Sequence, residues 1–141
     1  GEPEQVSVND VLEESIAGYY SILSEKGLIP EIDITDHKVI RILDRSALAR
    51  VFSNLINNAV KYSDGDLSVS LSADGTVVFS NRASQLTSVQ VEKLFDRFYT
   101  VEAARNSTGL GLSIARTLVE QMGGTISASV ENGVLSIVLH L

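Results

Sequence analysis

The sequence predicts an α+β fold: a two-layer sandwich of a mixed β-sheet covered on one face by about three helices. Segments with apolar residues at helical spacing alternate along the chain with pairs of short segments in which apolar and polar residues alternate. The 141 residues, 44% hydrophobic and 21% charged, suit one compact domain with its own core. We therefore expect residues 1–141 to form a single domain, as a fragment of a larger protein.

The composition limits the kinds of partner. The 18 acidic and 11 basic residues give a formal net charge of −7, so the overall field repels nucleic acid and anionic membranes. The chain has no cysteine, which excludes disulfides and thiolate metal sites. No apolar run approaches the ~20 residues of a membrane-spanning helix. We expect no nucleic-acid partner, and any bound polyanion must be held locally.

The first third of the chain predicts a strand, a helix and two more strands. Residues 5–8 alternate and predict an edge strand. Asn9 or Asp10 can cap the helix that follows. Residues 28–34 and 38–43 alternate on either side of a short polar segment, so they predict two strands that pair through a short turn.

A helix over residues 47–63 forms the centre of the predicted domain, and Asp44 is suited to begin it. One side of this helix carries an apolar stripe that is typical of a core-facing helix. The helix also contains Asn54, Asn57 and Asn58, although asparagine is a mediocre helix former. Two interpretations stay open: a solvated polar face, or a polar binding site.

Two hairpins are predicted in the remainder of the chain. Each has alternating strands around a short turn that contains glycine. The strands of the first hairpin are 67–72 and 76–80, and those of the second are 125–130 and 134–139.

Between the hairpins, residues 81–108 predict a long mobile connection with a hydrophobic anchor at 89–99. Gly109 and Gly111 open the next helix, which Gly123-Gly124 ends. A Gly-x-Gly at a helix start lets a phosphate approach bare backbone N–H groups, although a tight turn explains such a pair equally well. The helix at 47–63 can supply an asparagine amide oxygen for Mg²⁺ and a lysine cation for phosphate. Together with the Gly-x-Gly of the later helix, these groups suggest a phosphate and magnesium site between the two helices.

Three stretches in order carry a resemblance to a known family. NLINNAVKYS at 54–63 resembles the N box of sensor histidine kinases, LFDRFY at 94–99 their F box, and TGLGLSIA at 108–115 their G2 box. The chain is therefore similar to the catalytic, ATP-binding domain of a histidine kinase, in the superfamily of gyrase, heat-shock chaperones and MutL. The resemblance implies the Bergerat fold, ATP held with Mg²⁺, and a lid between the F and G2 boxes.

The resemblance also implies residue roles. Asn58 corresponds to the magnesium-binding amide and Asn54 to the residue one turn earlier, beside the phosphates. Asn54 occupies the position at which ATP-hydrolysing relatives carry a glutamate, and an amide cannot act as a general base, so ATP hydrolysis should be slow. By the same resemblance, Lys61 would contact phosphate, Tyr62 would form an aromatic wall against adenine or ribose, and Arg105 would reach the γ-phosphate. The backbone N–H groups that cradle the phosphates would come from Thr108, Gly109, Leu110, Gly111 and Leu112. Phe95 and Phe98 would dock the lid, with plain core aromatics as the alternative.

The chain departs from the family pattern at the G1 box. Asn81 stands where the adenine-binding aspartate is expected, and Ala83 and Gln85 stand where glycines are expected. The carbonyl of Asn81 can still accept a bond from adenine, at a cost on the order of 1 kcal/mol relative to a carboxylate. Without the glycines, we expect residues 82–86 to take another path.

The partners also follow from the resemblance. Neither His37 nor His140 lies in a context suited to a phosphoacceptor, so the histidine should lie on a dimerisation domain outside this chain, with a response regulator as an indirect partner. We expect an isolated monomer that cannot autophosphorylate, belonging to the cytoplasmic part of a membrane-bound sensor kinase. The alternatives are a degenerate, non-catalytic interaction module and, less favoured by the F box, a serine kinase of the anti-sigma type.

Overall fold

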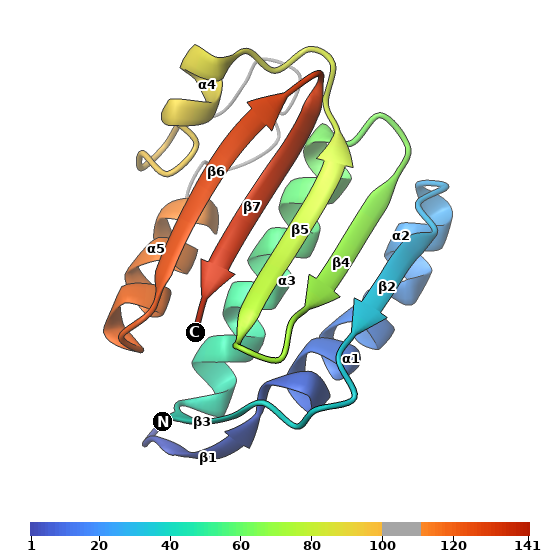
Figure 1. The fold of residues 1–141 in the computed structure, drawn as a ribbon. Coiled ribbons are helices and arrows are strands. Elements are labelled where there is room, and N and C mark those ends of the chain that lie inside the picture. Colours follow the sequence, from blue (N-terminus) through green and yellow to red (C-terminus); the bar gives the residue numbers. More distant parts are fainter. Residues whose placement is uncertain (100–110) are drawn as a thin grey trace.

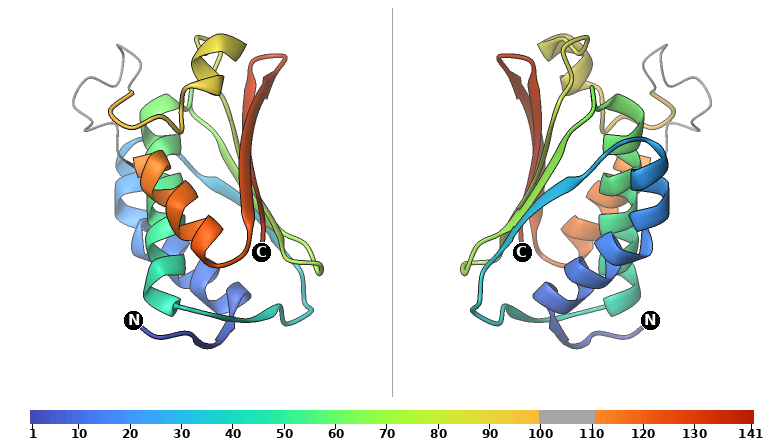
Figure 2. Two further views of the ribbon diagram at one scale, coloured as in Figure 1. Left: turned by 90° about the vertical axis from the view of Figure 1, so that its left-hand side faces the viewer. Right: turned by 90° about the vertical axis from the view of Figure 1, so that its right-hand side faces the viewer.

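The computed structural model describes residues 1–99 and 111–141. A five-stranded sheet in the order β2-β4-β5-β7-β6 forms one layer, and the helices lie together on one of its faces (Figures 1 and 2). The strands are β1 (Glu4–Ser7), β2 (Pro30–Ile34), β3 (Ile40–Leu43), β4 (Leu67–Leu71), β5 (Thr76–Arg82), β6 (Thr125–Glu131) and β7 (Val134–His140). The helices are α1 (Val8–Gly18), α2 (Tyr20–Glu25), α3 (Arg45–Tyr62), α4 (Ser88–Glu92) and α5 (Gly111–Gln121). The predicted fold class is confirmed.

The two predicted hairpins are confirmed, because β4 pairs with β5 and β6 with β7, both antiparallel. The predicted pairing of 28–34 with 38–43 is wrong. β2 instead runs parallel to β4, which makes the sheet mixed. β3 pairs with β1 in a separate two-stranded ribbon. The alternation gave the strands correctly but carried no information about their partners.

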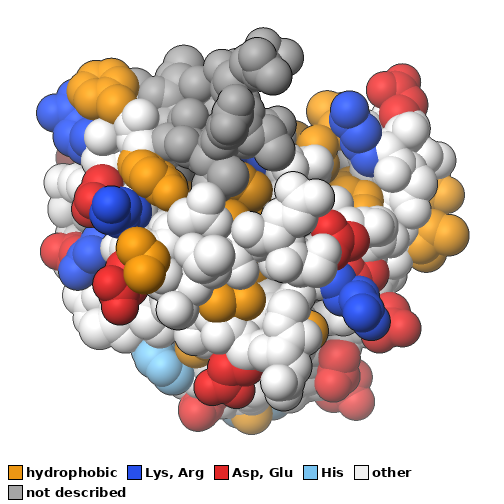
Figure 3. Space-filling view, turned by 90° about the horizontal axis from the view of Figure 1, so that it is seen from above, with side chains coloured by type: hydrophobic (Ala, Val, Ile, Leu, Met, Phe, Trp, Pro, Cys, Tyr) orange, Lys and Arg blue, Asp and Glu red, His pale blue; other side chains and the backbone are white. Residues whose placement is uncertain are grey.

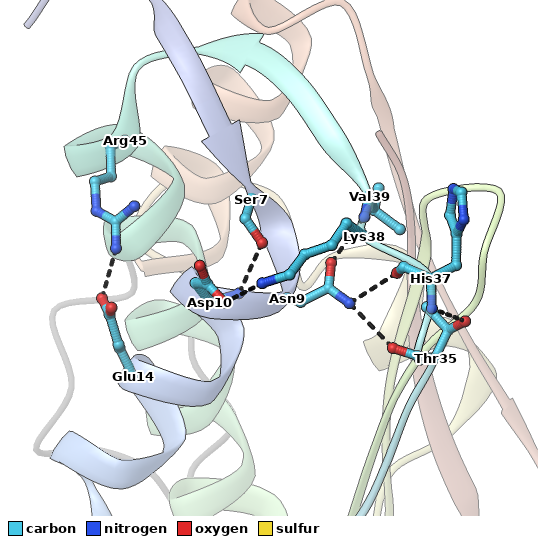
Figure 4. Close-up of polar contacts among 9 residues, drawn as sticks. All are labelled: Ser7, Asn9, Asp10, Glu14, Thr35, His37, Lys38, Val39 and Arg45. Atoms are coloured by element: carbon cyan, nitrogen blue, oxygen red, sulfur yellow. Dashed lines mark hydrogen bonds and ion pairs between the residues drawn. The ribbon is translucent and has the colours of Figure 1, made fainter.

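The buried side chain of Asn9 explains why these two strands separate (Figure 4). Its Nδ2 donates to the backbone oxygens of Thr35 (3.1 Å) and His37 (3.0 Å). Its Oδ1 accepts from the backbone N–H of Val39 at 2.9 Å. Asn9 is therefore not the helix cap. That position belongs to Ser7, whose hydroxyl accepts from the N–H of residue 10.

The helix count is higher than expected, because the described residues contain five helices rather than about three. The first predicted helix is divided at Tyr19 into α1 and α2. The anchor segment forms the short helix α4, which begins with a capping box formed by Thr87 and Gln90. The three long helices α1, α3 and α5 correspond to the predicted ones.

The core lies between the helices and the inner face of the sheet. Asp44 caps α3 as predicted, since its carboxylate accepts from the N–H groups of Ser46 and Ala47. The apolar stripe of α3 is buried, and Phe52 stacks on Phe79 of β5 with ring centroids 6.2 Å apart. α3 is thereby fixed against the middle of the sheet. No helix within 1–99 and 111–141 has the length and apolar character needed to cross a membrane.

Candidate functional site

The three asparagines of α3 point in different directions. Asn54 donates from Nδ2 to the backbone oxygen of Gly111 at 2.9 Å, which ties α3 to the first residue of α5. Asn57 contacts the hydroxyl of Tyr19 at 3.4 Å, toward the junction of α1 and α2. Asn58 is only 5% exposed. The interpretation as a solvated face is therefore wrong for Asn58, whereas Asn54 and Asn57 are half-buried.

Asn58 differs from the other two, because no hydrogen bond joins its amide to the described residues, and the amide still reaches solvent, since no fully enclosed side-chain polar atom of these residues lacks a partner. Most buried side-chain amides are hydrogen-bonded. Asn58 lies one turn beyond Asn54, on the helix that packs against α5. A buried amide oxygen at this position is suited to a ligand, and amide oxygens are among the ligands that Mg²⁺ accepts. No group of three or more His, Cys, Asp or Glu side chains suited to a metal occurs in the described ranges.

The last turn of α3 brings Lys61 and Tyr62 to the same end of the helix. Partial desolvation by neighbouring protein atoms lowers the pKa of Lys61 from its ordinary value of 10.5. A nearby phosphate would favour the charged ammonium and oppose this shift. Tyr62 is half-buried and packs against the core.

Asn81 lies on β5 at the same end of the molecule. It is 4% exposed and shares the inner face of the sheet with Val77 and Phe79. Its Nδ2 donates to the backbone oxygen of Arg82 at 3.1 Å. The same oxygen accepts from the N–H of Asp64 at 2.8 Å, which joins β5 to the segment after α3. The predicted base-binding residue is therefore close to the C-terminal end of the asparagine helix.

The segment after Asn81 folds back on the protein. Ala83 is buried and donates its N–H to the backbone oxygen of Gly133 at 2.7 Å. The N–H of Leu86 returns to the oxygen of Ala83 at 3.0 Å. Residues 82–86 thus form a tight turn against the β6-β7 hairpin.

Two residues that the sequence analysis did not single out hold this turn. The carboxylates of Asp66 and Asp64 accept from the backbone N–H groups of Arg82 (2.7 Å) and Ser84 (2.9 Å). The bond from Ser84 lowers the pKa of Asp64. The Ser-Asp-Gly-Asp sequence predicts a turn but contains no signal for a partner 16–20 residues later.

The two F-box phenylalanines have different environments. Phe95 is half-buried against the core, with the guanidinium of Arg116 5.6 Å from its ring centroid. Phe98 is 66% exposed and has a φ of 64°, which is unusual for an aromatic residue. The guanidinium of Arg97 lies 5.2 Å from its ring centroid. The alternative of a plain core aromatic is therefore wrong for Phe98.

Other predicted site residues lie at the start of α5 or outside the described residues. α5 begins at Gly111, where a Cβ would meet no atom of the described residues within 4 Å, and Leu112 is buried. Arg105, Thr108, Gly109 and Leu110 fall outside the described residues. In Figure 3, which looks onto this end of the molecule, charged side chains lie mainly toward the sides and the lower edge, and hydrophobic side chains are scattered both at the edge and nearer the middle.

Comparison with known proteins identifies the family. The family model described as "Histidine kinase-, DNA gyrase B-, and HSP90-like ATPase" matches residues 43–141. The chain belongs to this family. Among its relatives, the sensor histidine kinase YcbM of Bacillus subtilis is 33% identical over an alignment of 132 residues that covers 87% of this chain and 42% of YcbM. The histidine-protein kinase BaeS of Escherichia coli is 39% identical over an alignment of 95 residues that covers 61% of this chain and 20% of BaeS.

Solved structures of this ATPase family have the same fold. A mycobacterial sensor histidine kinase, MprB, superposes with a TM-score of 0.83 at 22% identity, over 97% of this chain and 95% of that one. The catalytic domain of histidine kinase ThkA gives a TM-score of 0.85 at 20% identity, over 99% and 96%. The resemblance to histidine kinase ATP-binding domains and the expected Bergerat fold are confirmed. The chain spans less than half the length of these curated relatives, at 42% and 20%.

Proposed function

We propose that this domain binds ATP with Mg²⁺ between α3 and α5 and donates the γ-phosphoryl group to a histidine on a dimerisation domain outside this chain, releasing ADP. Asn58 carries the proposal. It is a 5% exposed amide without a hydrogen bond in the described part of the molecule. A bound cation would take the place of the solvent that reaches this amide.

The remaining described residues fit a nucleotide in the same place. Asn54 holds Gly111 at the start of α5, so the first N–H groups of that helix are kept beside α3, where they would donate to a phosphate. Lys61 would contact phosphate as a point charge. Tyr62 in the last turn of α3 and Asn81 on β5 would face the ribose or base. Mg²⁺, when bound, would offset the charge of the phosphates.

The proposed chemistry is transfer to a histidine rather than to water. The amide of Asn54 has no basic group to activate water, and its nitrogen already donates to Gly111. Lys61 and Arg105 would stabilise the charge of the transferring phosphoryl group. The backbone cradle for the phosphates would be formed by Thr108, Gly109, Leu110, Gly111 and Leu112. Phe98 would dock the lid. Slow ATP hydrolysis by the domain alone is the expected result.

The first experiment is calorimetric titration of the 141-residue chain with a non-hydrolysable ATP analogue, with and without Mg²⁺. We expect Mg²⁺-dependent binding by the wild type and at least a 10-fold loss in Asn58→Ala, because the substitution removes the only proposed protein ligand to the metal. Asn57→Ala is the matched control. It removes the adjacent amide, which faces Tyr19 instead of α5, and should bind like the wild type.

Two results would contradict the proposal. Equal losses in Asn57→Ala and Asn58→Ala, with both variants folded by circular dichroism, would mean that Asn58 is not the metal ligand. An absence of binding at millimolar nucleotide would support the second candidate, a non-catalytic interaction module. That candidate is favoured by one observation: residues 82–86 form a closed turn around buried Ala83 where the family has a glycine loop.

The wider setting is also proposed. Residues 1–141 would be the catalytic and ATP-binding domain of a longer sensor kinase, on the cytoplasmic side where ATP is available, monomeric in isolation and acting on a response regulator only indirectly. His37 and His140 are both exposed, and the ring of His140 contacts the hydroxyl of Thr76 at 3.2 Å. Neither histidine lies on a helix, so we place the phosphoacceptor outside this chain.

A further inference from the structure

The strand β2 forms one edge of the five-stranded sheet. The strand order places it last, where β4 is its only neighbour in the sheet of the described residues. In the right-hand view of Figure 2, β2 runs across the front of the molecule, with α2 beside it. An open edge of this kind can accept a further strand, either from a second copy of the chain or from another protein.

The register of β2 shows which of its backbone groups point outward. The N–H of Thr35 donates to the backbone oxygen of Leu71 at 3.0 Å. Successive N–H groups of a strand point to opposite sides, so those of residues 31 and 33 also point to β4, in agreement with the parallel pairing. The N–H groups of Ile32 and Ile34 therefore point away from the sheet. Within the described ranges, neither donates to any residue.

Exposed apolar side chains gather in the part of the chain that forms this edge. Nine large hydrophobic residues of the described chain are exposed, and four of them lie between residues 20 and 32. Tyr20 (68% exposed) and Ile22 (43%) belong to α2, Ile32 (51%) belongs to β2, and Ile29 (84%) lies between the two elements. Edge strands that only protect against association carry charges or proline rather than such residues. The exposed isoleucines therefore indicate a surface that contacts a partner.

The outer face of the same edge is acidic. Glu31 and Asp33 are exposed, and they pair with Ser68 and Ser70 of β4. Ile32 lies between them in sequence, so its side chain is on the opposite face, toward the helices. Neither carboxylate forms an ion pair in the described part of the chain. An open groove lined by these carboxylates and by serines of β4 and β5 lies beside them, and the stems of long basic side chains can lie in it.

These charges distinguish between the possible occupants of the edge. A second copy that paired antiparallel about Ile32 would bring the carboxylates of the two copies together, and like charges on neighbouring strands are destabilising. A basic strand would meet opposite charges instead. Because side chains alternate between the faces of a strand, the complementary segment alternates as well. It would carry Lys or Arg on the outer face and apolar residues on the face of Ile32 and α2.

We propose that the open edge of β2 binds an extended, basic segment of a partner protein, which adds to the sheet as a further strand. Backbone hydrogen bonds to Ile32 and Ile34 supply affinity, and the side chains on the two faces supply specificity. Glu31 and Asp33 select Lys or Arg in the segment. This surface is different from the site between α3 and α5, so the proposal does not depend on nucleotide binding.

The probe is a blocked peptide of about eight residues in which lysine and valine alternate. It is titrated into the isotope-labelled 141-residue chain, and amide hydrogen exchange is followed by NMR. At saturation, exchange at Ile32 and Ile34 should slow roughly 10-fold or more, because their N–H groups become hydrogen-bonded. The amides of β6, at the other edge of the sheet, should exchange as before and serve as the internal control. A peptide with glutamate in place of lysine should not bind.

Two sets of variants separate charge from backbone pairing. The double variant Glu31→Lys, Asp33→Lys should bind the lysine peptide roughly 10-fold more weakly, the scale of two exposed ion pairs, and should gain binding of the glutamate peptide. Ile32→Pro removes an outward N–H and no bond to β4, so binding should weaken about 5- to 10-fold. Ile32→Val is the matched control and should bind like the wild type. If Ile32→Pro does not fold, the lysine peptide with methylated backbone nitrogens tests the same bonds and should not bind.

Three results would overturn the proposal. An absence of binding at millimolar peptide would mean that the acidic edge only protects against association. Binding that leaves exchange at Ile32 and Ile34 unchanged would mean a general attraction to the net charge of −7. Slowed exchange at these two amides at high protein concentration without peptide would identify a second copy as the occupant.

Discussion

Replacement of Asn9 by alanine should destabilise the domain more than most single substitutions. The side chain is 5% exposed and forms hydrogen bonds of 3.1, 3.0 and 2.9 Å to the segment between β2 and β3. At about 1 kcal/mol of net stabilisation for each bond, the loss is about 3 kcal/mol. Val39 is 1% exposed, so its N–H would remain buried without a partner, which adds to the cost.

The measurement is urea unfolding followed by circular dichroism. A loss of about 3 kcal/mol would lower the midpoint by roughly 1 M or more, given slopes of about 1–3 kcal/mol/M for small proteins. Asn9→Asp should be no more stable than Asn9→Ala at pH 7, because a buried carboxylate oxygen would face the backbone oxygens of Thr35 and His37.

Lys38→Ala is the matched control in the same region (Figure 4). It removes an ion pair of 3.2 Å with Asp10 in which the two side chains are 65% and 47% exposed, and such pairs contribute less than about 1 kcal/mol. If Asn9→Ala costs no more than Lys38→Ala, the Asn9 bonds do not hold this segment and the reasoning is refuted.

Two further predictions concern stability. In Gly124→Ala the new Cβ would lie 2.5 Å from the backbone oxygen of His140, so we expect the free energy of unfolding to fall by about 1–3 kcal/mol, measured by thermal or urea unfolding. Gly18→Ala, whose Cβ would meet no described atom within 4 Å, should stay within about 0.5 kcal/mol of the wild type. Equal effects of the two substitutions would contradict the packing argument. Hydrogen bonds, first from Ser46, lower the pKa of Asp44 from 3.8 to about 2, so its stabilisation is present above pH 4 and disappears as the pH falls toward 2. Asp44→Ala should therefore be less stable than the wild type at pH 7, with a gap that narrows between pH 4 and pH 2, and a gap independent of pH would count against the cap.

Local signals predicted the local parts of the fold. The two hairpins and the start of α3 at Asp44 depend on residues adjacent in sequence, and all three predictions are confirmed. The partners of β2 and β3 were predicted wrongly, because Thr35-Asp36-His37 looks like a hairpin turn. Backbone oxygens of this segment accept from the side chain of Asn9, 26–28 residues away, and no sequence pattern signals such a contact.

The site, like the fold, was predictable where it depends on local motifs and not where it depends on contacts between distant residues. The motifs indicated the asparagine helix, but spacing alone did not show that Asn54 binds Gly111 while Asn58 has no protein partner in the described ranges. The expectation that residues 82–86 take another path than a glycine loop stays a prediction, and the structure shows a tight turn there. The role of Asp64 and Asp66 in holding this turn was not predictable. Their carboxylates accept from backbone N–H groups, which do not depend on the type of side chain.

The position of β7 has a consequence for how the domain can be assembled. β7 lies between β5 and β6, and it supplies every residue that pairs with the free side of β5. During synthesis the ribosome therefore releases β5, with Val77 and Phe79 on its inner face, long before residues 134–140 exist. Until then β5 is an open edge, to which a strand of another nascent chain could add. Completion of the sheet, and protection from this kind of aggregation, depend on the final hairpin.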